Sequence, residues 1–332
     1  MKLGSFKNGT RDGALCVVSR DLKFGSIAYD VAPTLQSALD DWDYAVPRLE
    51  EIYDGLNRNP DTGRSFQIDF AQFHAPLPRA FYRANGSAYT SYIERARRAR
   101  SANAPKEPTT EPVIHQAASD GFVGPRDEIT VESDQWDIDL EGEVGVVTGD
   151  VPMGVKYEKA GSYIRLFMLL NGICLRNLAS SELEGELEFL PRNTWTSFAP
   201  VAVTVDELGD DWDGRKVKLP LVVHVNEDEL GRPNAGADMT FNFLRLISHA
   251  ARSRPLGAGS IVGSGVVSNK VTSAGFACIA EKRAWESTTQ GQPVTRFLRQ
   301  GDRIRLEMFD PQGNSIFGAI DQMVGPPRIG SV

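Results

Sequence analysis

Two glutamates one residue apart are the clearest candidates for chemistry in this sequence. Glu141 and Glu143 lie in the run DIDLEGEVGVV at residues 137–147. Alternate side chains of a strand project from one face, so the two carboxylates would lie side by side. Burying such a pair is costly unless water, a cation or a base lies between them, and oxygen ligands suit Mg²⁺ or Ca²⁺. The spacing therefore predicts either a divalent-cation site or an exposed acidic strand.

A glycine-rich segment at residues 257–268 is the second candidate. It reads GAGSIVGSGVVS, which lacks the glycine spacing of a dinucleotide-binding fingerprint. Ser264 lies between two glycines, but no strand–turn–helix context marks it as a nucleophile. Backbone N–H groups in such a loop can bind an anion. We expect either an anion-binding loop or a tight turn between strands.

The composition excludes several classes of protein. The chain has 332 residues, of which 41% are apolar, enough for a sizeable core in about two domains. Its 36 Lys and Arg against 44 Asp and Glu give a net charge of −8, so no basic surface for nucleic acid is indicated. No apolar run is long enough to cross a bilayer, and residues 1–4 lack the pattern of a signal peptide. We expect a cytoplasmic protein that binds neither nucleic acid nor membrane. The three cysteines are far apart and are expected to be reduced, buried thiols.

The elements that must position these residues are mostly strands. Apolar and alternating runs predict strands at residues 15–19, 144–147, 219–225 and 303–308. Helical spacing is found at residues 34–56, with Thr34 as the N-cap, and at residues 158–170 and 241–251. Pro47 is expected to break or kink the first of these, so residues 34–56 form either two short helices or one. The pattern is that of a β-rich α+β protein.

Two polar segments interrupt these elements. Residues 57–65 follow the first helical pattern, and residues 101–112 are rich in Pro, Thr, Lys and Glu. We expect residues 1–77 to form a small N-terminal domain and residues 78–332 a larger domain. The second polar segment would then be a surface loop or lid within the larger domain.

Short motifs spread over nearly the whole chain resemble the fumarylacetoacetate hydrolase superfamily, specifically its bacterial two-domain members. They lie in order at residues 1–3, 9–13, 85–89, 124–127, 150–154, 232–236, 258–265 and 315–318. The resemblance implies a mixed β-sandwich roll of the fumarylacetoacetase C-terminal type with a small N-terminal domain, assembled as a homodimer. It also implies a small-molecule substrate with a 1,3-dicarbonyl group and a bound Mg²⁺ or Ca²⁺ that polarises it.

The metal ligands implied by the resemblance are incomplete. Glu141 and Glu143 match the family's Glu-x-Glu pair. Asn85 and Gly172 stand where the family has its two aspartates, so two of four carboxylates are missing. Each lost anionic ligand removes charge that offsets the dehydration of Mg²⁺. We expect no metal cofactor, or only weakly bound Mg²⁺.

The organic groups implied by the resemblance are changed as well. Tyr92 stands at the family's catalytic His, and Asn193 at its Lys, with Arg192 as the alternative placement. Val266 replaces the Thr of the glycine-rich turn. Glu281 remains where the carboxylate partner of the His is expected, and Arg176 matches a family arginine. In the basic run at residues 94–100, Arg97 or Arg100 matches another arginine that binds substrate carboxylate; the alternative for this run is a solvated helix face.

These changes predict a cup-shaped site with little metal and a more aromatic lining. The aromatic groups would be Tyr89, Tyr92, His115 and Trp195, with His115 as a substitute base. The predicted catalytic residues are Glu281, Tyr92, His115 and Arg176, with Glu281 and Tyr92 as the acid/base pair. The predicted substrate-binding residues are Tyr89, Arg100, Asn193, Ser264, Gly265 and Val266.

Three functions follow from this pattern. The first is an enzyme that acts on a dicarbonyl compound by C–C cleavage, decarboxylation, tautomerisation or cyclisation, with little or no metal. The second is a conventional Mg²⁺-dependent hydrolase in which water replaces the lost ligands. The third is a non-catalytic binding protein.

Overall fold

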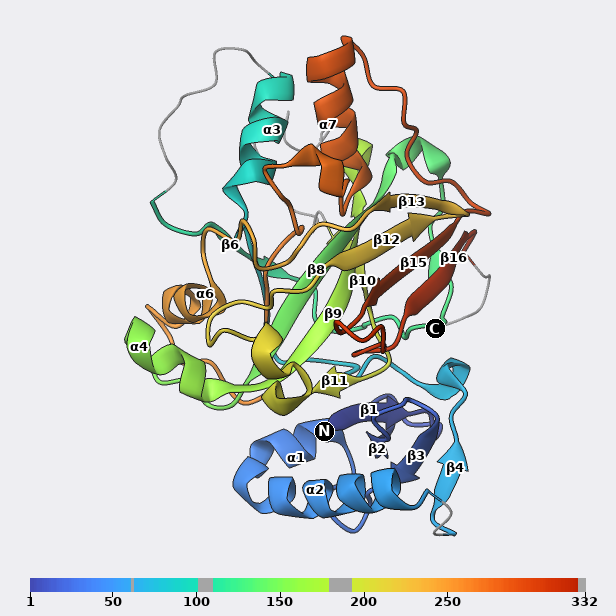
Figure 1. Ribbon diagram of the computed structural model, residues 1–332, viewed down its shortest axis with the longest axis vertical. Coiled ribbons are helices and arrows are strands. Elements are labelled where there is room, and N and C mark those ends of the chain that lie inside the picture. Colours follow the sequence, from blue (N-terminus) through green and yellow to red (C-terminus); the bar gives the residue numbers. More distant parts are fainter. Residues whose placement is uncertain (61–62, 101–109, 179–192, 328–332) are drawn as a thin grey trace.

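The computed structural model describes residues 1–60, 63–100, 110–178 and 193–327. In this part of the chain the strands form a long sheet and a second, five-stranded sheet, with helices at the periphery (Figure 1). The long sheet has the order β4-β3-β2-β1-β11-β9-β8-β14-β5-β6, with β10 paired to β9, and the second has the order β13-β12-β15-β16-β7. The expectation of a β-rich α+β fold is confirmed.

The first 77 residues form one end of the long sheet and two helices that cover it (Figure 1). The helical pattern at residues 34–56 gives α1 (Leu35–Asp40) and α2 (Trp42–Arg58), and the hydroxyl of Thr34 accepts from the Ser37 N–H as predicted. The break lies at Asp41, where ψ is 58°, and Pro47 lies inside α2. Two helices therefore form, as one of the two alternatives had it, but they are separated at Asp41, and α2 continues through Pro47. The strands are β1 (Lys2–Phe6), β2 (Ala14–Val18), β3 (Phe24–Ile27) and β4 (Ser65–Gln67).

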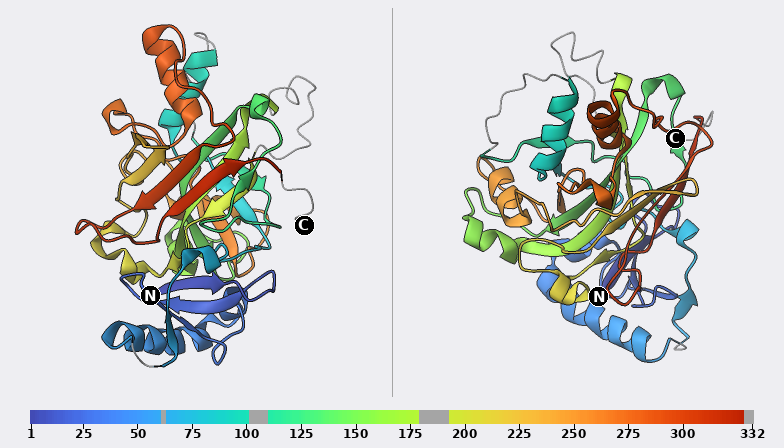
Figure 2. Two further views of the ribbon diagram at one scale, coloured as in Figure 1. Left: turned by 90° about the vertical axis from the view of Figure 1, so that its right-hand side faces the viewer. Right: turned by 45° about the horizontal axis from the view of Figure 1, so that its top comes forward.

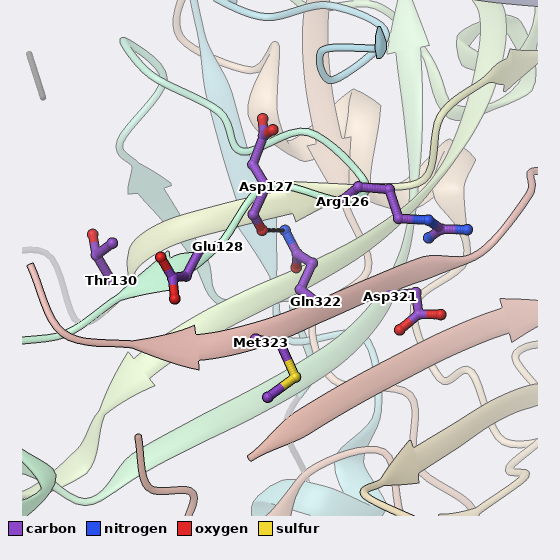
Figure 3. Close-up of a pocket in the computed structure, with 7 residues that line it drawn as sticks. All are labelled: Arg126, Asp127, Glu128, Thr130, Asp321, Gln322 and Met323. Atoms are coloured by element: carbon purple, nitrogen blue, oxygen red, sulfur yellow. Dashed lines mark hydrogen bonds between the residues drawn. The ribbon is translucent and has the colours of Figure 1, made fainter. Parts of the chain in front are cut away.

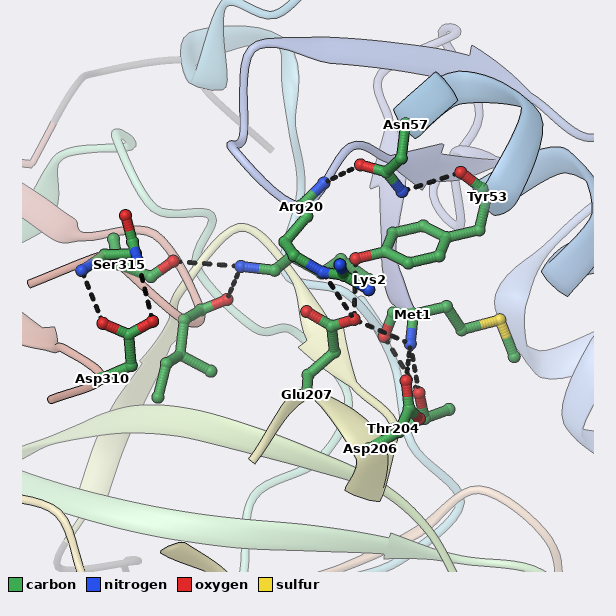
Figure 4. Close-up of polar contacts among 12 residues, drawn as sticks. Met1, Lys2, Arg20, Tyr53, Asn57, Thr204, Asp206, Glu207, Asp310 and Ser315 are labelled. Carbon is green, nitrogen blue, oxygen red and sulfur yellow. Dashed lines mark hydrogen bonds and ion pairs between the residues drawn. The ribbon is translucent and has the colours of Figure 1, made fainter. Parts of the chain in front are cut away.

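Backbone pairing and buried polar contacts join this N-terminal part to the rest of the chain. β1 pairs with β11 (Ala202–Val203), and Lys2 Nζ donates to the carbonyl oxygens of Ser315 at 3.0 Å and Ile316 at 2.7 Å (Figure 4). The Tyr53 hydroxyl donates to Glu207 Oε1 at 2.7 Å in the same cluster. The motif at residues 315–318 thus has a structural role, because its backbone is the docking point of Lys2. The domain boundary between residues 77 and 78 stays a prediction.

The centre of the molecule is an antiparallel pair of long strands, β8 (Ile138–Thr148) and β9 (Ile164–Leu175). The predicted helix at residues 158–170 is wrong, since only α4 (Tyr157–Ala160) is helical there before a short 3-10 turn. β9 is covered on both faces: Leu166, Met168 and Leu170 pack with the N-terminal core, and Phe167 and Leu169 with the larger core. A strand buried on both sides shows a continuous apolar run, which the sequence pattern does not distinguish from a buried helix.

The remaining elements complete the two layers. The further strands are β5 (Arg83–Gly86), β6 (Ile114–Ala117), β7 (Ile129–Thr130), β10 (Asn193–Phe198), β12 (Leu221–Val225), β13 (Asp228–Gly231), β14 (Ser260–Gly263), β15 (Arg303–Met308) and β16 (Ile320–Gly325). The helices are α3 (Thr90–Arg100), α6 (Phe243–Ala250) and α7 (Ile279–Gln290). The 3-10 turns are Phe70–Gln72, Asp134–Trp136, Gly161–Tyr163, Val205–Glu207, Gly209–Asp211 and Thr272–Ala274. Among the described residues, no helix has both the length and the apolar character needed to span a membrane.

Gly142 marks where the second sheet packs closely on β8. A Cβ at this position would lie 2.9 Å from Leu221 Cδ2 and 3.2 Å from Leu306 Cδ2, so a side chain would collide with β12 and β15. Residues next to Gly142 on the strand project to the opposite face. Glu141 and Glu143 therefore point away from the second sheet, to the face of the long sheet on which Asp139 contacts the start of α7.

Candidate functional site

Three acidic residues share one face of β8. Asp139, Glu141 and Glu143 alternate along the strand, and their exposed fractions are 0%, 7% and 0%. The prediction of an exposed acidic strand is therefore wrong, and partners must compensate three buried carboxylates. Asp139 was missed from the sequence, although the same two-residue spacing that selected the glutamates includes it.

Arg176 is the partner of the first two carboxylates. Its Nη2 lies 2.8 Å from Asp139 Oδ2 and 2.7 Å from Glu141 Oε1, and its Nε donates to Asp139 Oδ2 at 3.0 Å. The end of β9 fixes this arginine, since its backbone N–H donates to the Asp137 carbonyl oxygen at 3.1 Å. A guanidinium thus lies where the sequence suggested a cation or a base between carboxylates.

Asp139 also fixes the start of α7. Its Oδ1 accepts from the Ile279 N–H at 2.8 Å and its Oδ2 from the Ala280 N–H at 3.0 Å. The first N–H groups of a helix have no partner within the helix, so the carboxylate satisfies two of them and interacts favourably with the helix dipole. Burial nevertheless raises the pKa of Asp139, against the effect of Arg176. The acidic strand and α7 are therefore held as one unit.

Glu143 has a separate set of partners. Its Oε1 lies 3.6 Å from Arg83 Nη2 and accepts from Asn85 Nδ2 at 3.2 Å, and its Oε2 accepts from the Gly265 N–H at 3.2 Å. Arg83 and Glu143 are both 0% exposed. Burial raises the pKa of Glu143 to about 7, and the Arg83 charge acts in the opposite direction.

Gly265 reconciles the two interpretations of the glycine-rich segment. Its φ is +71°, and a Cβ there would lie 2.1 Å from the Gly86 carbonyl oxygen, so only glycine fits this tight turn. The same turn presents an N–H group to an anion, and that anion is Glu143 of the chain itself.

This arrangement does not fit the divalent cation that the resemblance implies. Asn85 points its amide nitrogen at Glu143, and Gly172 lies directly opposite Glu141 in the β8–β9 register without a side chain. Within the described ranges, no group of three His, Cys, Asp or Glu side chains is placed to hold a metal ion. Two guanidinium groups already compensate part of the charge of the three carboxylates, and a dication would have to compete with them.

Glu281 and Tyr92, the predicted acid/base pair, have different neighbours in the structure. Glu281, 1% exposed in the first turn of α7, forms an ion pair with Arg95 and accepts from Ser268 Oγ at 2.5 Å. Tyr92 experiences the charges of Arg176, Glu141 and Asp139, and burial raises its pKa. The structure thus pairs Glu281 with Arg95 in place of Tyr92, because a guanidinium compensates a buried carboxylate better than a neutral phenol does.

Other predicted residues lie at the rim or outside the described side chains. His115 is exposed on β6, directly across from Asn85, so it lies on the same sheet face as the acidic cluster. Arg97 is exposed on α3, and Arg100 ends that helix. Asn193 begins β10; its side chain and that of Arg100, like Arg192 as a whole, lie outside what the structure describes.

Three of the predicted substrate-binding residues are part of the core. The Tyr89 hydroxyl donates to the Ala235 carbonyl oxygen at 2.7 Å, Ser264 Oγ accepts from the Val144 N–H at 3.3 Å, and Val266 is 6% exposed among apolar neighbours. These contacts are structural, so a substrate would reach the three residues only if the core opened. Trp195 is paired with Ile173, which is paired with Leu140, so it lies on the face opposite Glu141. Its expected place in the aromatic lining is wrong.

Two cavities have linings that include none of the three acidic residues of β8. One, of about 590 Å³, lies beside β7 and β16 and is lined by Arg126, Asp127, Glu128, Thr130, Asp321, Gln322 and Met323 (Figure 3). The other, of about 180 Å³, lies between β12, β13 and α7, with Lys282 and Arg296 in its lining. None of the residues predicted from the sequence lines either cavity. The candidate site is therefore defined by the acidic strand and its arginines.

Comparisons with known proteins agree with this architecture. A family model described as fumarylacetoacetate (FAA) hydrolase C-terminal matches residues 83–325, and one described as fumarylacetoacetase N-terminal domain 2 matches residues 1–79. A 2,4-didehydro-3-deoxy-L-rhamnonate hydrolase of Sphingomonas sp. (strain SKA58) is 28% identical over 162 residues. That match covers 47% of this chain and spans only about half, 53%, of the hydrolase.

Two solved structures share the fold over nearly the full length. One is the maleylpyruvate hydrolase of Sphingobium sp. SYK-6 in complex with manganese(II) and pyruvate, with a TM-score of 0.64, 16% identity, and coverage of 98% of this chain and 100% of that one. The other is the fumarylacetoacetate hydrolase of Exiguobacterium antarcticum, with a TM-score of 0.64, 19% identity and the same coverage. The predicted roll with a small N-terminal domain is confirmed, and the chain belongs to the fumarylacetoacetate hydrolase family.

Proposed function

We propose that this chain is an enzyme of the fumarylacetoacetate hydrolase type that acts on a carboxylated 1,3-dicarbonyl or related compound without a required metal. The observation that carries the proposal is the contact of Arg176 with Asp139 and Glu141 at 2.7–3.0 Å. Arg176 matches an arginine of the metal-binding family, so the feature that distinguishes this chain is the loss of two ligand carboxylates at Asn85 and Gly172, while Arg176 compensates Asp139 and Glu141. The reaction class is C–C cleavage, decarboxylation, tautomerisation or cyclisation, all of which pass through an enolate-like charge.

Arg176 is suited to hold that charge. Its side chain is 22% exposed, while Asp139 beneath it is fully buried. Its Nε and Nη2 are fixed on the acidic strand, and a planar guanidinium attracts carboxylate and enolate oxygens. Donors fixed in advance toward developing charge are the largest single contribution to many enzymatic rates. Arg176 would therefore stabilise the enolate directly.

The remaining groups supply proton transfer and hydrogen bonding. Tyr92 stays protonated at neutral pH because burial raises its pKa, so its hydroxyl serves as a hydrogen-bond donor. Glu281 is the candidate base, and His115 lies at the rim on the same sheet face as the acidic cluster. General acid–base groups of this kind contribute about 10²–10⁴ in rate.

The relatives support the substrate class. The maleylpyruvate hydrolase binds pyruvate in its structure, and the Sphingomonas relative is a hydrolase of a 3-deoxy sugar acid. Both names describe 2-oxo or sugar acids, which carry the carboxylate that an arginine recognises. The manganese of that hydrolase is not carried over, because Asn85 and Gly172 lack the side chains that the resemblance requires.

Turnover with and without chelator tests this proposal. Purified protein is assayed with acylpyruvates and β-keto acids, in the presence of EDTA and again with added Mg²⁺ or Mn²⁺. We expect equal rates in both conditions, while the Sphingobium maleylpyruvate hydrolase, run in parallel on its own substrate, serves as the metal-containing comparison. A rate abolished by EDTA and restored by Mn²⁺ would support the conventional hydrolase instead. Measurable binding of these compounds without any turnover would support the non-catalytic alternative.

A further inference from the structure

Glu281 has two oxygens in different surroundings. Its Oε1 accepts from Ser268 Oγ at 2.5 Å and forms the ion pair with Arg95. Its Oε2 is buried and has no hydrogen-bond partner within the described part of the chain. Leaving a buried carboxylate oxygen without a partner costs free energy, and a catalytic role is one reason for which a protein retains such a group. This oxygen can accept a proton from a substrate, which would reach it, like Tyr89, Ser264 and Val266, only when the surrounding core opens.

Arg95 is held by more than Glu281. Its Nη1 also donates to Ser268 Oγ at 3.1 Å, and its Nη2 donates to the carbonyl oxygens of Asn269 and of Lys270, the latter at 2.9 Å. The guanidinium carbon also lies 5.9 Å from the centre of the Phe276 ring. These contacts fix the orientation of the guanidinium before any substrate arrives.

Two helices meet at this ion pair. α3 carries Arg95 and α7 carries Glu281, and the helices lie side by side at one end of the molecule (Figures 1 and 2). Ser91, one turn before Arg95, lies 2.8 Å from Ser268 Oγ and extends the same network. The start of α7 is fixed independently by Asp139. The carboxylate of Glu281 is therefore oriented from two sides.

We propose that Arg95 is a positioning residue, which keeps Glu281 ionised in its buried position and turns Oε2 toward the substrate as the base. The inference rests on the proposed function. The step assigned to Glu281 is the acceptance of one proton from a substrate C–H bond by Oε2. The electron pair of that bond remains on the substrate as the enolate, and no group is oxidised or reduced.

The charges around Glu281 agree with this role. Burial raises the pKa of Glu281, Asp139 on β8 adds to that effect, and Ser268 and Arg95 oppose it. Cys278, at the start of α7, accepts from the Glu281 N–H and is a neutral thiol, since burial raises its pKa as well. Arg95 is thus the positive charge that faces Glu281 from α3.

The pH profile of turnover tests the positioning role. In Arg95→Met, the acidic limb of kcat/KM is expected to move up by about one pH unit or more, because the base loses its counter-ion. Arg95→Lys keeps the charge and is expected to restore part of the shift. Arg252→Met, which breaks a surface ion pair with Glu111, is the control and should leave the profile unchanged. An Arg95→Met profile that coincides with the parent's would overturn the inference.

Thermal unfolding gives a readout that needs no substrate. Without Arg95 the folded-state pKa of Glu281 rises further above its unfolded value, so stability is lost as the pH increases. Arg95→Met should therefore lower Tm more at about pH 8 than at about pH 5, and the difference should vanish in a Glu281→Gln background. Equal Tm losses at both pH values would show that Arg95 is not the counter-ion of Glu281. If the parent protein shows no turnover, the proposed function is refuted. The Tm measurements still show whether Arg95 is the counter-ion of Glu281.

Discussion

Replacing Arg83 by methionine is expected to lower the free energy of unfolding by about 3–5 kcal/mol, because it leaves a buried charge without its partner. Arg83 and Glu143 are each 0% exposed and lie 3.6 Å apart. Without the guanidinium, Glu143 loses its positive neighbour and keeps its hydrogen bonds from the Asn85 amide and the Gly265 N–H. Urea denaturation followed by circular dichroism measures the change in unfolding free energy.

Two further variants test whether the loss of stability in Arg83→Met comes from the uncompensated charge of Glu143. Arg79→Met removes an ion pair with Asp12 whose side chains are 46% and 37% exposed, and it should cost less than about 1 kcal/mol. The double variant Arg83→Met/Glu143→Met removes both charges and should recover most of the lost stability. If Arg83→Met is as stable as Arg79→Met, the charge compensation assigned to Arg83 is incorrect.

The second large effect is expected on catalysis, at Arg176. Arg176→Met should lower kcat/KM by about 10²–10³, the usual cost of removing a donor that faces developing negative charge. The measurement uses whichever acylpyruvate or β-keto acid the parent protein converts. Like the loss of Arg83, this change leaves buried carboxylates, here Asp139 and Glu141, without their cation, so the rate is compared per folded protein as measured by circular dichroism.

Arg176→Lys separates charge from geometry. Lysine keeps the positive charge on Asp139 and Glu141 but cannot form the planar fork of hydrogen bonds. We expect a folded protein with kcat/KM between those of the parent and of Arg176→Met. Parent-like kcat/KM in both variants would remove Arg176 from the chemistry and leave it a purely structural cation.

Prediction from the sequence succeeded where a residue pattern is compatible with only one local structure. The two-residue spacing of Glu141 and Glu143 placed them correctly on one strand face, and the order of the motifs led to the correct family and fold. It failed at residues 158–170, because a strand buried on both faces and a buried helix share an apolar run. It also failed at Trp195, whose face depends on the pairing of β10 with β9, a long-range fact that local spacing does not contain.

The partners of the acidic strand could not be read from local pattern. Arg83 lies 60 residues before Glu143, and Arg176 reaches Asp139 and Glu141 only through the β8–β9 pairing. The sequence showed that ligands of a metal were missing at Asn85 and Gly172. It did not show that arginines compensate the remaining carboxylates, because that depends on side chains brought together from β5, β8 and the end of β9.

Direct titration with Mn²⁺, followed by electron paramagnetic resonance of the free ion, is the sharpest test of whether arginines replace a metal on the acidic strand. The maleylpyruvate hydrolase of Sphingobium serves as the positive comparison, since it was solved with manganese. Our account predicts that the free-ion signal of this protein grows in proportion to added Mn²⁺, as in buffer alone. Stoichiometric uptake of Mn²⁺ at micromolar concentration that disappears in Glu141→Gln would contradict it.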